Sequence, residues 1–431
     1  MDSKTTAGAL KPGHVLAVSA GNALEFYDFL TYGFFAAQIG RAFFPSTDPT
    51  ASLLAALATF GVGFLMRPVG AGVIGVIADK AGRKPAMLLS FMLMGASMLG
   101  MALIPSHAHI GALAGVLAVI CRMVQGFALG GQVGPSTSYM VEAAPPNRRG
   151  FFVSLQFVSQ YIAIIASGVV GSTLAHSMPE AALDSWGWRV AFLVGLVIVP
   201  FGLVLRRGLA ETYEGGSGAG AAAEAKAAPD AKSGGFGSTA LLGLLLLAGG
   251  TTVNYLGNYT TLYATQTLHL PSVVGFTSTI MVGIGGLVGS ALGGWLGDRF
   301  SRRPLIVWPF AVQVLIVVPM FLAVVATRSP LILWVVTAAF SFVNGLGSTN
   351  TLVFITEGMP AAIRGRSTGL IYAISISVFG GSTQFTVAWL TALTHSPMAP
   401  AWYVTAIVAL SLVASLFLPK KSPAGLSEAV V

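Results

Sequence analysis

Residues 75–85 read Gly-Val-Ile-Ala-Asp-Lys-Ala-Gly-Arg-Lys-Pro, and residues 294–304 repeat the pattern as Gly-Trp-Leu-Gly-Asp-Arg-Phe-Ser-Arg-Arg-Pro. A second pair of stretches lies at nearly the same offset. Residues 142–150 read Glu-Ala-Ala-Pro-Pro-Asn-Arg-Arg-Gly, and residues 357–365 read Glu-Gly-Met-Pro-Ala-Ala-Ile-Arg-Gly. Two matched pairs at near-equal offsets indicate that one structural unit occurs twice in the chain.

The sequence around these landmarks is strongly apolar. Of its 431 residues, 55% are hydrophobic and 9% are charged, whereas soluble domains average about 25% charged residues. Long apolar runs recur about twelve times, so we predict an all-α membrane protein with twelve transmembrane helices in two pseudo-symmetric six-helix bundles. The predicted spans are about residues 14–40, 52–77, 86–104, 110–141, 151–175, 189–207, 238–262, 273–296, 304–326, 330–356, 366–393 and 399–418.

One connection between the spans differs from the others. Residues 208–237 are rich in Gly, Ala and Ser, carry scattered charges and show no apolar period. This composition is typical of a flexible linker. We therefore predict an N-terminal bundle over residues 1–207, a cytoplasmic linker over 208–237 and a C-terminal bundle over 238–431.

The net charge of +8 is explained by membrane topology, and we predict no nucleic-acid partner. Most Lys and Arg residues fall in the connections that an even number of spans places on one side, and only Arg41, Arg189 and Arg328 fall on the other. This positive-inside bias predicts that both termini are cytoplasmic. Two further arginines, Arg67 and Arg122, lie within predicted spans.

Acidic residues also occur within a span. Residues 21–34 contain Glu25 and Asp28, three positions apart and on one helix face with Asn22 and Tyr32. A charged side chain at that depth costs at least about 2.5 kcal/mol. The directions of the first, second and fourth spans place both acids and both central arginines near the membrane midplane, where they can neutralise one another until an anion binds.

The two central arginines have a structural and a functional interpretation. A buried ion pair could only fix helix packing, and Pro68 beside Arg67 points to a bend there. The functional interpretation is favoured because buried pairs are a poor source of stability. Guanidinium groups also bind carboxylates through two parallel, charge-assisted hydrogen bonds.

Residues 75–85, 122–126 (Arg-Met-Val-Gln-Gly) and 142–150 together resemble the major facilitator superfamily. Residues 21–29, 65–70 (Leu-Met-Arg-Pro-Val-Gly) and 186–192 (Trp-Gly-Trp-Arg-Val-Ala-Phe) are similar to its metabolite:proton symporter subfamily, and within it to the citrate–proton symporters. The resemblance covers nearly the whole chain. It implies proton-coupled uptake of an organic di- or tricarboxylate, with citrate favoured, by alternating access in the cell inner membrane.

The resemblance, combined with position, selects the candidate site residues. For substrate binding we predict Arg122, Arg67, Gln125, Tyr32, Asn22, Gln160, Gln132, Asn344, Ser348 and Asn254. For proton coupling we predict Asp28 or Glu25. In the resembled superfamily, charged loop residues tie helix ends together during gating, and the matching positions here are Asp79, Arg83, Glu142, Arg149, Asp298, Arg302, Glu357 and Arg364.

One position departs from the subfamily. Many members carry an acid shortly after the pattern at residues 122–126, but residues 130–132 here read Gly-Gly-Gln. An amide in place of an acid leaves Gln132 without a proton-carrying role, although it can still bind substrate.

Several alternatives remain open at this stage. The substrate could be another small metabolite such as 2-oxoglutarate, shikimate or betaine. The chain could also be a membrane sensor, which should carry a signalling domain, or an exporter of hydrophobic cations, which would not need central arginines. The six histidines do not cluster and Cys121 is the only cysteine, so we expect no metal, no cofactor and no enzymatic activity. We expect a monomer in a lipid bilayer, with the organic anion and the proton as its partners.

Overall fold

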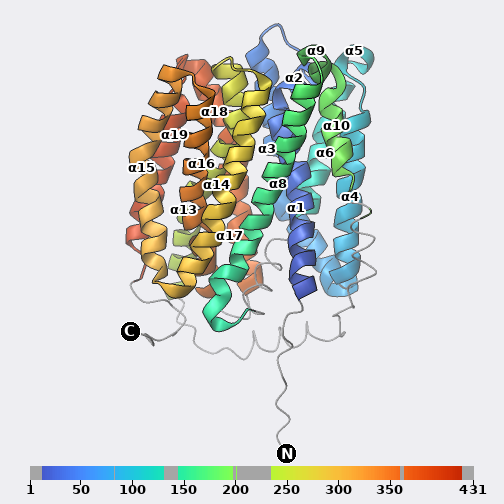
Figure 1. The fold of residues 1–431 in the computed structure, drawn as a ribbon. Helices are drawn as coiled ribbons and strands as arrows, with labels where there is room; N and C mark the ends of the chain where they lie inside the picture. The colour runs from blue at the N-terminus through green and yellow to red at the C-terminus, as the bar shows by residue number, and fades with distance from the viewer. Residues whose placement is uncertain are drawn as a thin grey trace, which may run out of the picture.

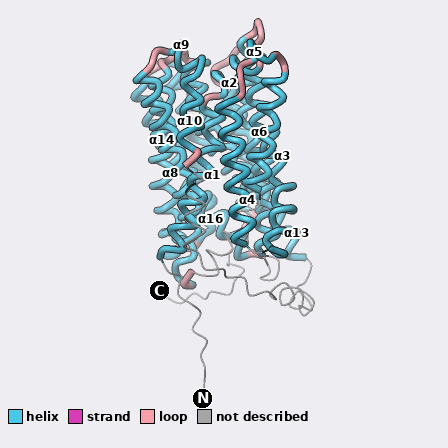
Figure 2. Tube along the Cα trace, turned by 90° about the vertical axis from the view of Figure 1, so that its right-hand side faces the viewer, coloured by secondary structure: helices cyan, strands magenta, loops and turns pink. Residues whose placement is uncertain are grey.

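The protein, seen in a computed structural model, is a long bundle of roughly parallel helices (Figures 1 and 2). The structure describes residues 12–81, 83–130, 144–197, 200, 234–359 and 364–419. Within those ranges every regular element is helical, which confirms the expected all-α class. Helices suit a membrane because each satisfies its own backbone hydrogen bonds where no water is present.

The N-terminal half runs up and down the bundle several times (Figure 1). Its helices are α1 (Pro12–Phe34), α2 (Ala36–Phe43), α3 (Pro49–Ala81), α4 (Arg83–Leu103), α5 (His107–Ile110), α6 (Leu113–Gly130), α8 (Arg149–Ser177), α9 (Glu180–Ala182) and α10 (Trp188–Gly195). The short helices α2, α5 and α9 lie at the end opposite to the one where α1 begins (Figure 1).

The C-terminal half repeats the same up-and-down course. Its helices are α13 (Gly234–Leu262), α14 (Ser272–Arg299), α15 (Arg302–Thr327), α16 (Pro330–Glu357), α17 (Arg364–Ser375), α18 (Gly381–Thr394) and α19 (Ala399–Leu416). A π-helical turn, Ile376–Gly380, joins α17 to α18 within one crossing.

Each of the twelve predicted spans contains helix in the part that is described. Nine helices among the described residues are long and apolar enough to cross a membrane. The protein is therefore a multi-pass membrane protein.

The first span departs from the prediction, because residues 14–40 do not form one continuous helix. Phe35 separates α1 from α2 with backbone angles of φ −100° and ψ 17°. Its fully buried ring packs on the ring of Phe276 in the other half, with ring centres 4.9 Å apart. The break therefore accompanies an aromatic contact between the halves that no local pattern in the first span could predict.

The most extensive contact between the halves joins α8 to α14. Small residues allow the two backbones to approach, as in other membrane helix pairs. A Cβ atom on Gly294 would lie 2.7 Å from the carbonyl oxygen of Gly150, and one on Gly171 would overlap the ring of Phe276. Because these contacts lie near opposite ends of α8, this helix pair holds the halves together over most of its length.

Candidate functional site

Close packing of α3 against α6 brings two buried arginines together. A Cβ atom on Gly126 would overlap the carbonyl oxygen of Gly63, and one on Gly130 would overlap that of Arg67. Only glycine permits so close an approach of the two backbones. Arg67 on α3 and Arg122 on α6 lie within this contact.

The Arg122 side chain is completely buried. Its Nη1 donates a hydrogen bond to Oε1 of Gln125. Its guanidinium carbon lies 4.3 Å from the ring centre of Phe29, 4.5 Å from that of Tyr32 and 5.1 Å from that of Phe60. These distances allow cation–π attraction, which is strongest where water is excluded.

Arg67 lies in the same aromatic environment. Its guanidinium carbon is 4.4 Å from the ring centre of Phe29 and 4.5 Å from that of Phe64. The ring of Tyr255 on α13 packs on the ring of Phe64, with ring centres 5.3 Å apart. A residue of the C-terminal half therefore packs on the aromatic rings that surround the arginines of the N-terminal half.

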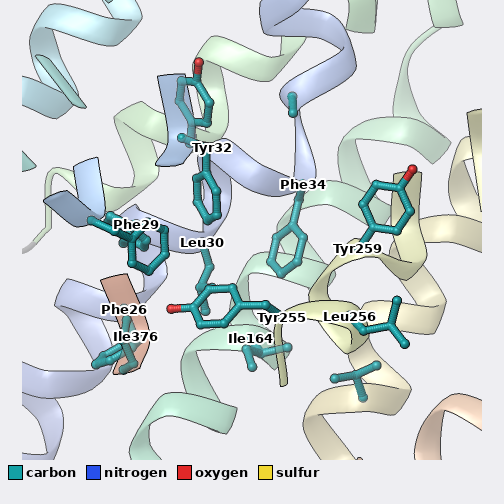
Figure 3. Close-up of a cluster of buried hydrophobic side chains, with 14 of the residues drawn as sticks. Phe26, Phe29, Leu30, Tyr32, Phe34, Ile164, Tyr255, Leu256, Tyr259 and Ile376 are labelled. Carbon is teal, nitrogen blue, oxygen red and sulfur yellow. The ribbon is translucent and has the colours of Figure 1, made fainter. Parts of the chain in front are cut away.

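We call this group the arginine cluster. It consists of Arg67, Arg122, Gln125, Phe29, Tyr32, Phe60, Phe64 and Tyr255. In Figure 3 the Tyr255 hydroxyl points to the side on which Phe29 and Phe26 lie. The cluster thus holds two positive charges in an aromatic setting on the boundary between the halves.

A polar pocket lies beside the arginine cluster. In this structure its cavity volume is about 30 Å³, close to the space of one water molecule. Its polar lining comes from both halves of the chain and consists of Gln160, Tyr161, Thr251, Asn254, Tyr255, Asn344, Ser348, Thr351 and Tyr372.

The lining groups of the polar pocket also bind one another. Gln160 Nε2 donates to the Tyr372 hydroxyl at 3.5 Å, and Ser348 Oγ donates to Asn344 Oδ1 at 3.4 Å. The first of these contacts joins the two halves across the pocket.

The predicted substrate residues fall into two groups. Arg67, Arg122, Gln125 and Tyr32 belong to the arginine cluster, whereas Gln160, Asn254, Asn344 and Ser348 line the polar pocket. Neither arginine lines the pocket, and Tyr255 belongs to both groups. Sequence reasoning missed Tyr255, Tyr161 and Tyr372, although Tyr255 directly follows the selected Asn254.

Asn22 is placed elsewhere. Its Nδ2 donates to Ser159 Oγ at 2.7 Å and to the Gln156 carbonyl at 3.2 Å, and its Oδ1 accepts from Gln156 Nε2 at 3.0 Å. Both ends of its amide therefore bind α8 in this structure. Gln132 and the side chains of Glu25 and Asp28 lie outside the described residues.

Four of the predicted gating residues meet where α8 begins and α14 ends. Asp298 accepts hydrogen bonds from the backbone N–H groups of Gly150 and Phe151, at 2.6 and 2.8 Å. Glu357 forms one ion pair with Arg302 and a second with Arg149, the latter at 3.7 Å. The side chains of Asp79, Arg83, Glu142 and Arg364 lie outside the described residues.

The chemistry of the site is that of binding charged and polar groups. Among the residues that the structure describes, no group of three or more His, Cys, Asp and Glu residues could hold a metal ion. The arginine cluster can bind an anion, and the polar pocket can accept the hydroxyl and carboxylate groups of a small molecule.

Comparison with known proteins gives a consistent result. Residues 20–383 match the family model of the Major Facilitator Superfamily. The chain is 33% identical to the citrate-proton symporter of Klebsiella pneumoniae, covering 98% of this chain and 95% of the relative. It is 34% identical to the citrate-proton symporter of Salmonella typhi, with 94% of each covered.

Other relatives and a solved structure extend the comparison. The alpha-ketoglutarate permease of Escherichia coli (strain K12) is 31% identical, over 94% of this chain and 93% of the relative. The solved D-xylose-proton symporter aligns with a TM-score of 0.77, covering 95% of this chain and 97% of that one. At 19% identity this likeness concerns the fold alone.

Proposed function

This chain belongs to the Major Facilitator Superfamily of membrane transporters, and we propose that it takes up an organic di- or tricarboxylate, with citrate as the first candidate, together with protons. It is a transporter and not an enzyme. The observation that carries the proposal is the pair of buried guanidinium groups, Arg67 and Arg122, in a chain that is 33% identical to a citrate-proton symporter over nearly its full length.

The two arginines would bind carboxylate groups of the substrate. Each guanidinium can form two parallel hydrogen bonds to one carboxylate, and such bonds are strong where water is excluded. Gln125 and Tyr32 would orient Arg122, which they contact on two sides. A substrate with two or more carboxylates can use both positive charges.

The polar pocket would supply the contribution of the C-terminal half. Asn254, Asn344 and Ser348 would bind hydroxyl or carboxylate groups, and Gln160 would do so from α8. Rocking of the two bundles about this central site would expose it to each side of the membrane in turn. The ring of Tyr255 must then move for a carboxylate to pass from the pocket to Arg67.

The remaining assignments complete the proposal. Asp28 or Glu25 would carry the proton, and Gln132 and Asn22 would contribute substrate contacts in another state of the transport cycle. The charged gating residues would hold the cytoplasmic ends together. The bundles would comprise residues 1–207 and 238–431, joined by a linker at 208–237, in a monomer of the inner membrane with both termini cytoplasmic.

A second candidate substrate is 2-oxoglutarate, because the alpha-ketoglutarate permease is a relative of nearly equal coverage. Shikimate and proline or betaine transporters are also related to this chain. Two buried arginines favour an anion over betaine, which carries no net charge.

Uptake by the purified protein in proteoliposomes tests this function. Radiolabelled citrate should accumulate when the outside is made acidic, and unlabelled citrate should compete better than 2-oxoglutarate, shikimate or betaine. Accumulation that does not depend on the pH gradient would contradict proton coupling. If only unlabelled 2-oxoglutarate competes, the substrate is 2-oxoglutarate and not citrate.

A further inference from the structure

One phenyl ring contacts both buried guanidinium groups. The ring centre of Phe29 lies 4.4 Å from the guanidinium carbon of Arg67 and 4.3 Å from that of Arg122. Since both distances are measured from one point, the two positive charges are less than about 9 Å apart, a range at which they repel each other appreciably in a low-dielectric interior. Three helices meet at this ring, because α1 carries Phe29, α3 carries Arg67 and α6 carries Arg122.

The ring of Phe29 is held on several sides. None of its surface is exposed. It packs edge-on against Phe64, with ring centres 4.6 Å apart, and at a tilt against Phe60, with ring centres 5.2 Å apart. A Cβ atom on Gly63 would lie 3.5 Å from the ring. Neighbours this close leave a phenyl ring little freedom to change position.

We propose that Phe29 is a specificity-determining residue, whose ring sets the separation of the Arg67 and Arg122 guanidinium groups and so the spacing between substrate carboxylates that the site accepts. This inference rests on the proposed function, because it assumes that both arginines bind carboxylates. Phe29 acts through the two arginines and is therefore a positioning residue.

The physical basis is the rigidity of the ring compared with the flexibility of arginine. A free arginine side chain can adopt many conformations, and both cation–π contacts restrict the two guanidinium groups to fixed places against one ring. Two carboxylates joined by a short carbon chain have a limited span. Only diacids whose span matches the two guanidinium positions can form both pairs of hydrogen bonds without distortion.

The test compares the binding of diacids of increasing length. The purified full-length wild type and the Phe29→Leu variant would each be titrated with the diacids malonate, succinate, glutarate and adipate, and with the tricarboxylate citrate. The smaller leucine lets the guanidinium groups approach, so the preferred diacid should become shorter. The ratio of Kd values between adjacent diacids should change by about tenfold, the scale expected from losing ring contacts to two cations.

Phe34→Leu is the matched control. Phe34 lies on the same helix and is equally buried, and it should keep the wild-type order of diacids. If Phe29→Leu does not yield folded protein, Phe29→Met replaces it, because methionine is closer to phenylalanine in volume. The same shift toward shorter diacids is expected.

The outcomes separate this inference from the proposed function. Equal weakening of all diacids in the Phe29 variants, with their order unchanged, would show that the ring only supports packing and would overturn the inference while the function stands. If the folded wild type binds none of the acids, the proposed function fails and the inference fails with it.

Discussion

The carboxylate of Asp298, at the end of α14, accepts a hydrogen bond from the backbone N–H of Gly150, in the first turn of α8, at 2.6 Å. Its second oxygen accepts from the N–H of Phe151 at 2.8 Å. The first turn of a helix has unpaired N–H groups and a partial positive charge, and both favour a carboxylate there. A side chain of the C-terminal half thus caps a helix of the N-terminal half.

We expect Asp298→Asn to open this end of the molecule more often. The amide keeps one acceptor but loses the charge, and losing such a cap costs about 0.5–2 kcal/mol. A cysteine placed at Ser348 in the polar pocket, in a Cys121→Ser background, should therefore react with a water-soluble thiol reagent about two- to thirtyfold faster. Asp184→Asn is the control, because Asp184 pairs with the exposed Arg41 within the N-terminal half. An unchanged labelling rate in Asp298→Asn would show that the cap does not restrain opening.

We expect Arg122→Ala to abolish citrate binding in protein that is still folded. Arg122→Lys should also lose most of its affinity, by at least about 100-fold, since an ammonium group cannot form two parallel bonds to a carboxylate. Titration calorimetry on protein that elutes as one peak provides the measurement. Arg41→Ala, which removes an exposed arginine, is the control. If Arg122→Ala binds citrate with wild-type affinity, Arg122 serves only helix packing and the substrate site lies elsewhere.

The sequence predicted the depth of the two arginines but not their surroundings. Arg67 and Arg122 were expected at one level because the second and fourth spans run in the same direction, and both in fact contact Phe29. The ring contacts depend on how closely α3 approaches α6. That distance is set by glycines on two different spans, and hydropathy along one span carries no information about it.

Similar reasons account for the other differences. The interruption of the helix at Phe35 accompanies the contact of its ring with Phe276, more than 200 positions away in sequence. The partners of Asn22 were not predictable because an amide at mid-membrane can bind either substrate or another helix, and only the packing of α8 decides which. The repeated loops, in contrast, carry a local pattern, from which the sequence predicts two similar halves with charged residues at their edges.

We expect Glu357→Gln to destabilise the protein. The carboxylate is almost fully buried and forms ion pairs with Arg302 of its own half and Arg149 of the other. Removing one partner of a buried ion pair costs about 3–5 kcal/mol, because the remaining charge is left without compensation. The midpoint of thermal unfolding in detergent should fall by at least about 3 °C.

Glu180→Gln is the matched control for that measurement. Glu180 is exposed and accepts one hydrogen bond, from Ser272 at 3.3 Å. Its substitution should leave the midpoint unchanged, as most surface changes do. A midpoint equal to that of the wild type in Glu357→Gln would mean that the ion pairs contribute no net stability.

The last prediction concerns the coupling proton, which we assign to Asp28 in preference to Glu25. Both acids lie on α1, and Asp28 directly precedes Phe29, whose ring contacts both arginines. An anion bound to Arg122 neutralises a charge that otherwise favours an ionised acid nearby, so proton and anion should bind cooperatively. Linkage requires that each strengthens the binding of the other by the same factor.

The two neutral variants should therefore behave differently. Asp28→Asn should still exchange labelled citrate for unlabelled citrate across a proteoliposome membrane, but it should no longer accumulate citrate when a pH gradient is imposed. Glu25→Gln should instead weaken binding or folding. Arg328→Gln, directly after the C-terminal end of α15, is a control that should leave both activities intact. If both acid variants still accumulate citrate against its gradient, a different group carries the proton or a different ion drives transport.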